Sequence, residues 1–238
     1  TFRADTNGTV RSLATDGTRL YVGGAFTTIN GYNRQRIAAV NLSTGAVDTT
    51  WAANANATVY SLAVGGGRLY AGGAFTSLKN VTRNRIGALS LADSSVTPYA
   101  PVLDAAVSSI VVDASGSRVY LGGDFTTVNG AAAPWLAKTD ASGILAPVAW
   151  QGLLGPALDL ELDADGTRLA VAQGGAGNRG TWYEADTGTR LWFQRCDGDG
   201  QAIHIVGGTV VTGFHESCEY DTSIRLTANA VSDGARDR

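Results

Sequence analysis

The chain has 238 residues, a net charge of −3, 31 glycines, five prolines and only 16% charged residues. The low charge and the alternating apolar pattern exclude a disordered chain, and the weak negative charge gives no signal for nucleic acid or an anionic membrane. No apolar run reaches the roughly 18–20 residues of a membrane helix, so no membrane insertion is expected. Methionine is absent even at position 1, from which we expect a processed or excised segment.

A repeated pattern organises the sequence. Residues 19–42, RLYVGGAFTTINGYNRQRIAAVNL, are matched by residues 68–91 and 118–140, which keep the Arg-apolar-Tyr, Gly-Gly and Phe-Thr groups. Weaker copies follow, and the units begin near residues 10, 59, 107, 157 and 200. A unit that returns every 43 to 50 residues predicts a repeat architecture.

Each unit predicts four short strands. The expected strands of the first unit are residues 10–14, 20–26, 37–42 and the stretch that ends at Trp51. Asp16-Gly17 is typical of a hairpin turn, and Gly23-Gly24 inside the second strand admits close approach by a neighbouring backbone. No segment keeps a 3.6-residue period, so no helix is expected.

The fifth unit contains three expected strands, and the two ends of the chain complement each other. Phe2 precedes Val10 by the same eight residues that separate Trp51 from Val59, so residues 1–8 are expected to complete the fifth unit. Closure of this kind removes the open edges of a sheet stack. The sequence therefore predicts an all-β fold, a closed five-bladed β-propeller of four-stranded blades, as a single domain over residues 1–238.

The pattern GGAFTTINGYNRQRIAAVNLSTG, residues 23–45, resembles the delta-60-type β-propeller repeat of secreted or surface proteins of bacteria, mainly actinobacteria. The resemblance covers essentially the whole chain: it is strong in units one to three, weak in four and moderate in five. Repeats of that family often have His and Cys after the second strand, and residues 213–218, GFHESC, look like a variant of this form. The resemblance implies a propeller fold and secretion, and it implies no particular reaction.

The long loops between second and third strands are the expected place for binding. They share one face of a propeller with the links between blades, and variable loops on a rigid scaffold usually carry function. Amide, arginine and aromatic side chains suit a hydroxyl-rich ligand, although solvated loops without a specific role are the plain alternative. The candidate ligand-binding residues are Asn30, Tyr32, Asn33, Arg34, Lys79, Asn80, Arg83, Asn84, Asp124, Asn129, Trp135, His215, Glu216, Tyr220 and Asp221.

Two series of arginines recur at fixed positions. Arg36, Arg85, Arg179 and Arg225 precede the third strands, where unit three has Trp135, and Arg19, Arg68, Arg118 and Arg168 follow the first turns. An anionic ligand is one interpretation of the first series. A structural tie to backbone carbonyls is the favoured interpretation of both series, because a guanidinium has five donors and a repeat reuses its packing devices.

Asp124 and His215 occupy the position that Ala25 and Ala74 fill in the first two units, which suggests a central pocket. Some five-bladed propellers are glycosidases with central carboxylates, so a glycoside-acting enzyme is one alternative. Against it, no carboxylate recurs at matched positions, and no nucleophile elbow, metalloprotease motif or phosphate-binding loop is present. We therefore expect neither catalysis nor a metal nor a cofactor.

Cys196 and Cys218 allow one disulfide between neighbouring blades, with unpaired buried thiols as the alternative. A disulfide favours an extracytoplasmic location. Taken together, the sequence predicts a secreted or cell-surface, non-catalytic binding module, most simply for a cell-surface carbohydrate. A protein-docking or structural module of a larger secreted protein is the alternative. The expected partner is a glycan or a protein, not a nucleic acid, and the propeller is expected to be monomeric.

Overall fold

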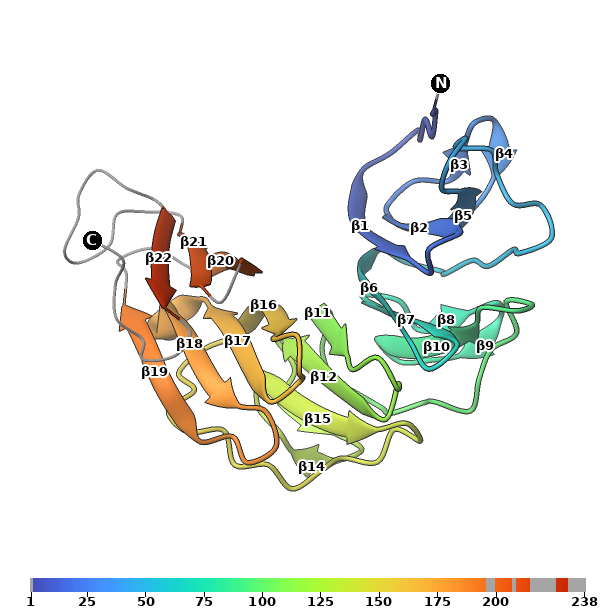
Figure 1. The fold of residues 1–238 in the computed structure, drawn as a ribbon. Coiled ribbons are helices and arrows are strands. Elements are labelled where there is room, and N and C mark those ends of the chain that lie inside the picture. Colours follow the sequence, from blue (N-terminus) through green and yellow to red (C-terminus); the bar gives the residue numbers. More distant parts are fainter. Residues whose placement is uncertain (1, 196–199, 207–208, 215–225, 231–238) are drawn as a thin grey trace.

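The computed structural model describes residues 2–195, 200–206, 209–214 and 226–230. In this part of the chain, five principal antiparallel sheets follow one another in sequence order along an arc (Figure 1). We call these sheets blades one to five. The structure thus has the all-β, blade-by-blade architecture that the repeat predicts.

The blades have the following strands. Blade one has β1 (Val10–Thr15), β2 (Arg19–Gly24) and β5 (Ile37–Asn41), with a small hairpin of β3 (Thr28–Ile29) and β4 (Tyr32–Asn33). Blade two has β6 (Val59–Gly65), β7 (Arg68–Gly73) and β10 (Ile86–Ser90), with β8 (Ser77–Leu78) and β9 (Val81–Thr82). Blade three has β11 (Val107–Val112), β12 (Arg118–Gly123) and β15 (Leu136–Asp140), with β13 (Thr127–Val128) and β14 (Ala131–Ala132). Blade four has β16 (Ala157–Leu162), β17 (Arg168–Gln173), β18 (Arg179–Glu184) and β19 (Arg190–Arg195), and a 3₁₀ turn at Gly175–Gly177. Blade five has β20 (Gly200–Val206), β21 (Thr209–Phe214) and β22 (Leu226–Ala230).

The fourth strand is complete only in blade four among the described residues. In blade one it is reduced to a single bridge between Val40 and Val47, and blades two and three have a bridge at the same place. In blade one the strand ends because the Asp48 carboxylate accepts the backbone N–H groups of Thr50 and Trp51, at 2.9 and 3.0 Å. This turn directs the Trp51 side chain into the core instead of extending the strand.

The hydrophobic core lies between consecutive blades. Tyr21 and Trp51 of blade one pack with Leu62 of blade two, and the two rings meet edge-on with centroids 5.0 Å apart. A Cβ atom on Gly23 would lie 3.0 Å from the side chains of Val59 and Leu62. The first glycine of the Gly-Gly pair is therefore needed for the next blade to pack. The predicted close approach of a backbone occurs at the second glycine, Gly24, where an added Cβ atom would lie 2.1 Å from Thr9 O.

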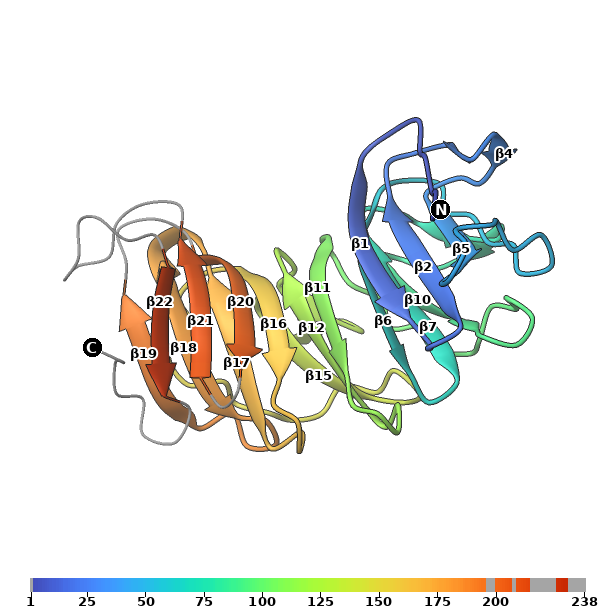
Figure 2. The same cartoon turned by 45° about the horizontal axis from the view of Figure 1, so that its top comes forward.

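First strands lie side by side along the inner side of the arc (Figures 1 and 2), and a repeated side-chain contact joins them. Ser12 Oγ accepts the backbone N–H of Leu62 at 2.9 Å, Ser61 Oγ that of Ile110 at 3.0 Å, Ser109 Oγ that of Leu160 at 3.2 Å, and Asp159 Oδ2 that of Ile203 at 3.0 Å. We call these four contacts latches. A latch satisfies an N–H group that is close to the buried interface, where a missing partner is costly.

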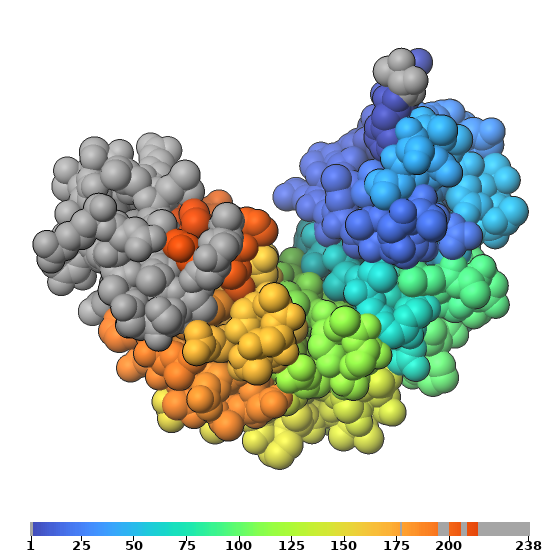
Figure 3. Space-filling model, viewed as in Figure 1, coloured from blue at the N-terminus to red at the C-terminus, as the bar shows by residue number. Residues whose placement is uncertain are grey.

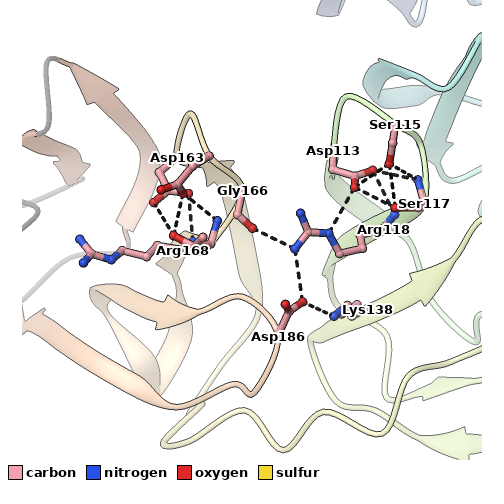
Figure 4. A network of polar contacts seen from close by, with 11 residues as sticks. Asp113, Ser115, Ser117, Arg118, Lys138, Asp163, Gly166, Arg168 and Asp186 are labelled. Atoms are coloured by element: carbon pink, nitrogen blue, oxygen red, sulfur yellow. Dashed lines mark hydrogen bonds and ion pairs between the residues drawn. The ribbon is translucent and has the colours of Figure 1, made fainter.

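The arginines that follow the first turns join each blade to the next one. Arg19 donates to Leu91 O at 3.0 Å and Arg68 donates to Ala141 O at 2.7 Å, each in the following blade. Arg118 donates to Gly166 O at 3.0 Å and also pairs with Asp186 (Figure 4). The structural interpretation of this arginine series is confirmed for these three residues.

Closure into a ring of five blades is not seen. Within the described residues, the segment 2–8 pairs with no strand of blade five; it contacts blade one, where Asp5 N donates to Asn30 Oδ1 at 2.8 Å. The side chain of Leu13 is 58% exposed, whereas its counterpart Leu62 is 6% exposed beneath blade one. Blade five has Ala202 at the latch position, and a methyl group cannot accept the N–H of Leu13. The described blades therefore form an open arc.

Candidate functional site

The loops and the links between blades form one continuous surface, which we call the loop face. Gln35 O accepts the N–H of Ala55 at 3.1 Å, and Asn54 O accepts the N–H of Lys79 at 3.0 Å, so the link between blades one and two lies against both their loops. Between them is a pocket of about 320 Å³. We call it the loop-face pocket; it is lined by Asn33, Arg34, Gln35, Ala52, Ala53, Asn54, Lys79 and Asn80.

Four predicted candidates thus meet in one pocket, namely Asn33, Arg34, Lys79 and Asn80. Asn33 and Asn80 are exposed, and Asn33 uses its backbone carbonyl to bind Arg34, so its side-chain amide can meet a ligand. Sequence reasoning missed Gln35 and Asn54, although both belong to the same loop and link and carry the same chemistry. Their position next to the predicted candidates was the available signal.

Several other candidates hold the loops in place. Asn30 Oδ1 accepts Asp5 N at 2.8 Å, and its Nδ2 donates to Gly45 O at 3.0 Å; Asn129 makes the two equivalent contacts in blade three at 2.8 and 3.0 Å. Lys79 occupies the same position in blade two and donates to a serine hydroxyl at 2.9 Å. All three have left-handed φ angles of 47°, 53° and 46°, which asparagine tolerates well. Each of these side chains joins its loop to neighbouring segments.

Arg34 and Arg83 lie at equivalent positions and make equivalent contacts. Each donates one hydrogen bond to the carbonyl of the preceding residue and one to a carbonyl in the segment that follows the third strand of its blade. The distances are 2.9 and 3.2 Å for Arg34 and 2.7 and 2.6 Å for Arg83. The Nε atom of both side chains is buried and has no partner among the described residues. Two guanidinium nitrogens are thus committed to the blade in each case.

The residues before the third strands share a strained backbone. Arg36, Arg85 and Trp135 have φ angles of 69°, 72° and 66°, a region that bulky side chains rarely adopt. Arg36 donates to Ala55 O in the link at 3.1 Å, and Arg85 donates to Ala74 O. Both contacts are structural; Arg36 makes the predicted tie toward the next blade, whereas Arg85 binds a carbonyl of its own blade. Arg179 is buried in β18, and Arg225 lies outside the described residues.

Trp135 belongs to a different, apolar pocket beside blade three. This pocket has a volume of about 310 Å³, and small residues of the loop, Ala133 and Pro134, lie where blades one and two have Arg and a polar residue. Its lining is Ala132, Ala133, Pro134, Trp135, Leu136, Ala137, Lys138, Leu145, Ala146, Pro147, Val148, Ala149, Trp150 and Leu153. The loop face therefore offers a polar pocket at blades one and two and an apolar one at blade three.

The remaining candidates are dispersed. Tyr32 is 49% exposed in β4, Asn84 is half-buried, and Asp124 is exposed at the end of β12. Asp124 is not among the residues that line a described pocket. His215, Glu216, Tyr220 and Asp221 lie outside the described residues, as do both cysteines of the expected disulfide, Cys196 and Cys218.

A third concavity lies on the inner side of the arc, and none of the residues that line it was among the predicted candidates. It has a volume of about 490 Å³ and is lined by Arg11, Ser12, Tyr60, Ser61, Ser108, Ser109, Leu158, Asp159 and Gln201. We call it the axial groove (Figure 3). Burial raises the pKa of the Asp159 carboxyl above its ordinary value, against the opposing effect of the N–H groups and hydroxyl that it accepts.

The described residues contain neither a candidate metal site nor a candidate membrane-spanning helix. Residues 2–195 and the short described segments after them contain no group of three or more His, Cys, Asp or Glu side chains that could hold a metal ion. The described part of the chain also has no helix that is long and apolar enough to cross a membrane.

Comparisons with known proteins agree on the fold. Residues 19–50 match the model of a β-propeller domain of unknown function, DUF5122. A chain of the crystal structure of a nidogen/laminin complex is similar, with a TM-score of 0.63 and 15% identity over 97% of this chain and 79% of that one. A chain of the mitotic checkpoint complex gives a TM-score of 0.66 and 14% identity over 98% and 67%. No curated protein matches the sequence. At these identities the likeness concerns the fold alone, and it identifies the repeat as a β-propeller repeat.

Proposed function

We propose that this protein is a secreted or cell-surface, non-catalytic binding module that recognises a carbohydrate through the loop-face pocket. The observation that supports this most is the gathering of amide side chains from two blades, Asn33 and Gln35 from one and Asn80 from the next, around one 320 Å³ pocket. An amide offers a donor and an acceptor at once, as neighbouring sugar hydroxyls require.

The chemistry around the pocket fits the same ligand class. Asn54 binds the blade-two loop and Gln35 binds the link through their backbone carbonyls, which leaves their side-chain amides available. The scaffold residues below, such as Asn30, fix the loop in advance and reduce the entropy lost on binding.

A glycan array tests this proposal. The wild-type protein should bind a defined set of glycans in competition with free sugar, and the double variant Asn33→Ala/Asn80→Ala should lose at least about tenfold in affinity, since two paired hydrogen bonds are removed. Asn84→Ala, an amide of the blade-two loop that lines neither the loop-face pocket nor the concavity on the inner side of the arc, is the matched control and should leave array binding unchanged. A blank array, or equal binding by the double variant, would contradict the proposal.

A protein partner is the second candidate function, because the apolar pocket at Trp135 suits an apolar side chain better than a sugar. The two similar structures are protein complexes by their titles, which is consistent with a docking role for this fold. The test is a blank glycan array together with a purified partner whose binding Trp135→Ser abolishes. Val81→Ser, which removes a 41% exposed apolar side chain from blade two, should have no effect.

A glycoside-acting enzyme has less support. Of the described residues that line the axial groove, Asp159 is the one carboxylate, whereas glycoside hydrolysis ordinarily uses two. Both oxygens of Asp159 accept hydrogen bonds from the protein, which gives this residue a structural task already.

A further inference from the structure

The residues that line the axial groove come from the first strands of all five blades, β1, β6, β11, β16 and β20. These strands lie on the inner side of the arc (Figure 1). All of its described lining residues except Leu158 have polar side chains. Two kinds of position contribute: the latch residues, and the residue just before each latch. The second kind is the one that varies along the chain.

A β-bulge at the same position of every first strand aims these varying side chains at the groove. In blade one, Val10 pairs with Gly24 and Ser12 pairs with Gly23, so Arg11 is an extra residue without a partner in the ladder. The same register shift occurs in the other four blades and leaves Tyr60, Ser108, Leu158 and Gln201 as the bulged residues. Bulges characteristically redirect one side chain while keeping the strand paired.

In blades one to three, the second glycine of the Gly-Gly pair makes room for this geometry, whereas Gln173 and Phe214 stand at the same position in blades four and five. A Cβ atom on Gly24 would lie 2.1 Å from the carbonyl oxygen of Thr9, and Gly73 and Gly123 have the same close approach at 2.2 Å. The backbone entering the first strand thus passes directly over the second strand. In these three blades the second glycine therefore allows the close approach that positions the bulged residue.

The residues next to the bulge are fixed by packing, whereas the bulged residue is not. The preceding position is Val10, Val59 and Val107 in the first three blades, and the latch position is serine in all three. Between them the residue changes from arginine to tyrosine to serine, and then to leucine and glutamine in blades four and five. On a constant scaffold, the place where the sequence varies is the place where recognition is expected.

The latch residues are already engaged, which leaves the bulged side chains as the ones able to meet a ligand. Ser12 and Ser61 each accept a backbone N–H of the next blade. Asp159 is occupied through both oxygens, by Ile203 N on one side and by Leu160 N and Ser109 Oγ on the other. Its charge is therefore largely directed into the protein, and Arg11 supplies the exposed charge of the groove.

We propose that the axial groove is a second binding site, for a hydroxyl-rich molecule that carries one carboxylate, such as a uronic acid unit of an acidic glycan. The carboxylate pairs with Arg11, whose guanidinium lies 6.0 Å from the centre of the Tyr60 ring. A guanidinium binds a carboxylate through two parallel hydrogen bonds. Ser108 and Gln201 bind hydroxyls from the other blades, and a volume of about 490 Å³ accommodates a molecule of this size.

The test compares galacturonate with galactose, which differ by a carboxylate in place of a hydroxymethyl group. Binding is measured by NMR titration of the whole chain. Galacturonate should shift signals of Arg11, Ser108 and Gln201, and it should bind at least about tenfold more tightly than galactose, a ratio equal to about 1.4 kcal/mol. Arg11→Ala should remove this preference while leaving galactose binding unchanged, and Gln201→Ala should weaken both sugars.

Two control variants make the result specific. Arg3→Ala removes an equal charge at an exposed site outside the groove and should keep the preference for galacturonate. Asn33→Ala/Asn80→Ala, in the loop-face pocket, should leave galacturonate binding unchanged. The proposal is overturned if galacturonate does not bind, if Arg11→Ala keeps the preference, or if Arg3→Ala removes it as effectively as Arg11→Ala does.

Discussion

The junction between blades two and three and the junction between blades four and five use different chemistry for the same contact. At the first, the Ser61 hydroxyl accepts the N–H of Ile110 at 3.0 Å. At the second, the Asp159 carboxylate accepts the N–H of Ile203 at 3.0 Å, and the Glu161 carboxylate accepts both Ile205 N and His204 Nδ1, at 2.8 and 2.9 Å. The repeat preserves an acceptor at this position and not a residue type. The carboxylate adds a charge that burial penalises, so only this junction acquires a dependence on pH through its latch.

The aromatic residues show a second difference between early and late junctions. Trp51 is 1% exposed, meets Tyr21 edge-on at 5.0 Å and donates to Ser90 O at 2.9 Å. Trp150 is only half-buried and lies 6.3 Å from the ring of Tyr120, beside the apolar pocket. The spacing from Trp150 to the next first strand is one residue shorter than the spacing from Trp51, which gives the link a different path.

The largest expected effect is that of Trp51→Ala. Removing this buried ring and its indole hydrogen bond should lower the free energy of unfolding by about 3–5 kcal/mol. Trp150→Ala, the matched change at the looser junction, should cost roughly 1–2 kcal/mol, because less surface is buried there. Urea denaturation of both variants measures the difference, and equal losses would mean that the two junctions are packed alike.

Asp159→Ala and Ser61→Ala should have the next largest effects, about 1–3 kcal/mol each, since each leaves an N–H group near the interface without its acceptor. The two losses should appear at different places. Hydrogen exchange should accelerate at Ile203 in the first variant and at Ile110 in the second. Acceleration spread evenly over all blades in either variant would argue against local latches.

The pH dependence of the blade-five junction has a predictable sign. Burial holds the pKa of Asp159 above its ordinary 3.8, so the ionised carboxylate lowers stability above the raised pKa. This cost disappears as pH falls through the raised pKa to about 3.8. Asp159→Ser restores the latch of blades one to three without a charge. The stability of the wild type relative to this variant, measured by urea denaturation, should therefore be higher near pH 4 than near pH 7.

Other carboxylates should not obscure this measurement. Burial acts to raise the pKa of Asp48, but hydrogen bonds from Thr50, Trp51 and Arg19 outweigh it and lower the pKa to about 2. Its contribution is complete above pH 3.8 and is lost only as pH falls toward 2. A relative stability that decreases from pH 7 to pH 4 would contradict the assignment of a raised pKa to Asp159.

The smallest effect is expected at the surface network of Figure 4, where Asp186 pairs with Lys138 at 2.6 Å and with Arg118 at 3.3 Å. Asp186 is 65% exposed, so Asp186→Asn should cost at most about 1 kcal/mol and less at high salt. Arg118→Ala should cost more, because it also breaks the tie to Gly166 O in the next blade. Denaturation in low and high salt checks both, and a salt-independent loss in Asp186→Asn would contradict an ion-pair contribution.

The site was only partly accessible to sequence reasoning. Asn33 and Asn80 were correctly placed on the loop face, and the pocket that joins them contains both. Asn30 and Asn129 have the same residue type in the same loops, yet their amides bind neighbouring segments of the chain. The residue type does not distinguish the amides that line the pocket from those that hold the loop, because this depends on which side chain faces the link.

The sequence by itself determined the repeat, the strand order within a blade and the scaffold role of the arginines, because these depend on local spacing and on donors that recur in every unit. The tertiary structure alone decided what the Gly-Gly pair does: Gly23 admits the next blade, and Gly24 admits the strand that carries the bulge. An apolar pair three residues apart, as in Val10 and Leu13, was the trace of this bulge in the sequence. In the sequence this pair looks like ordinary alternation of apolar and polar residues. Only the pairing with the neighbouring strand shows that Arg11 faces the axial groove.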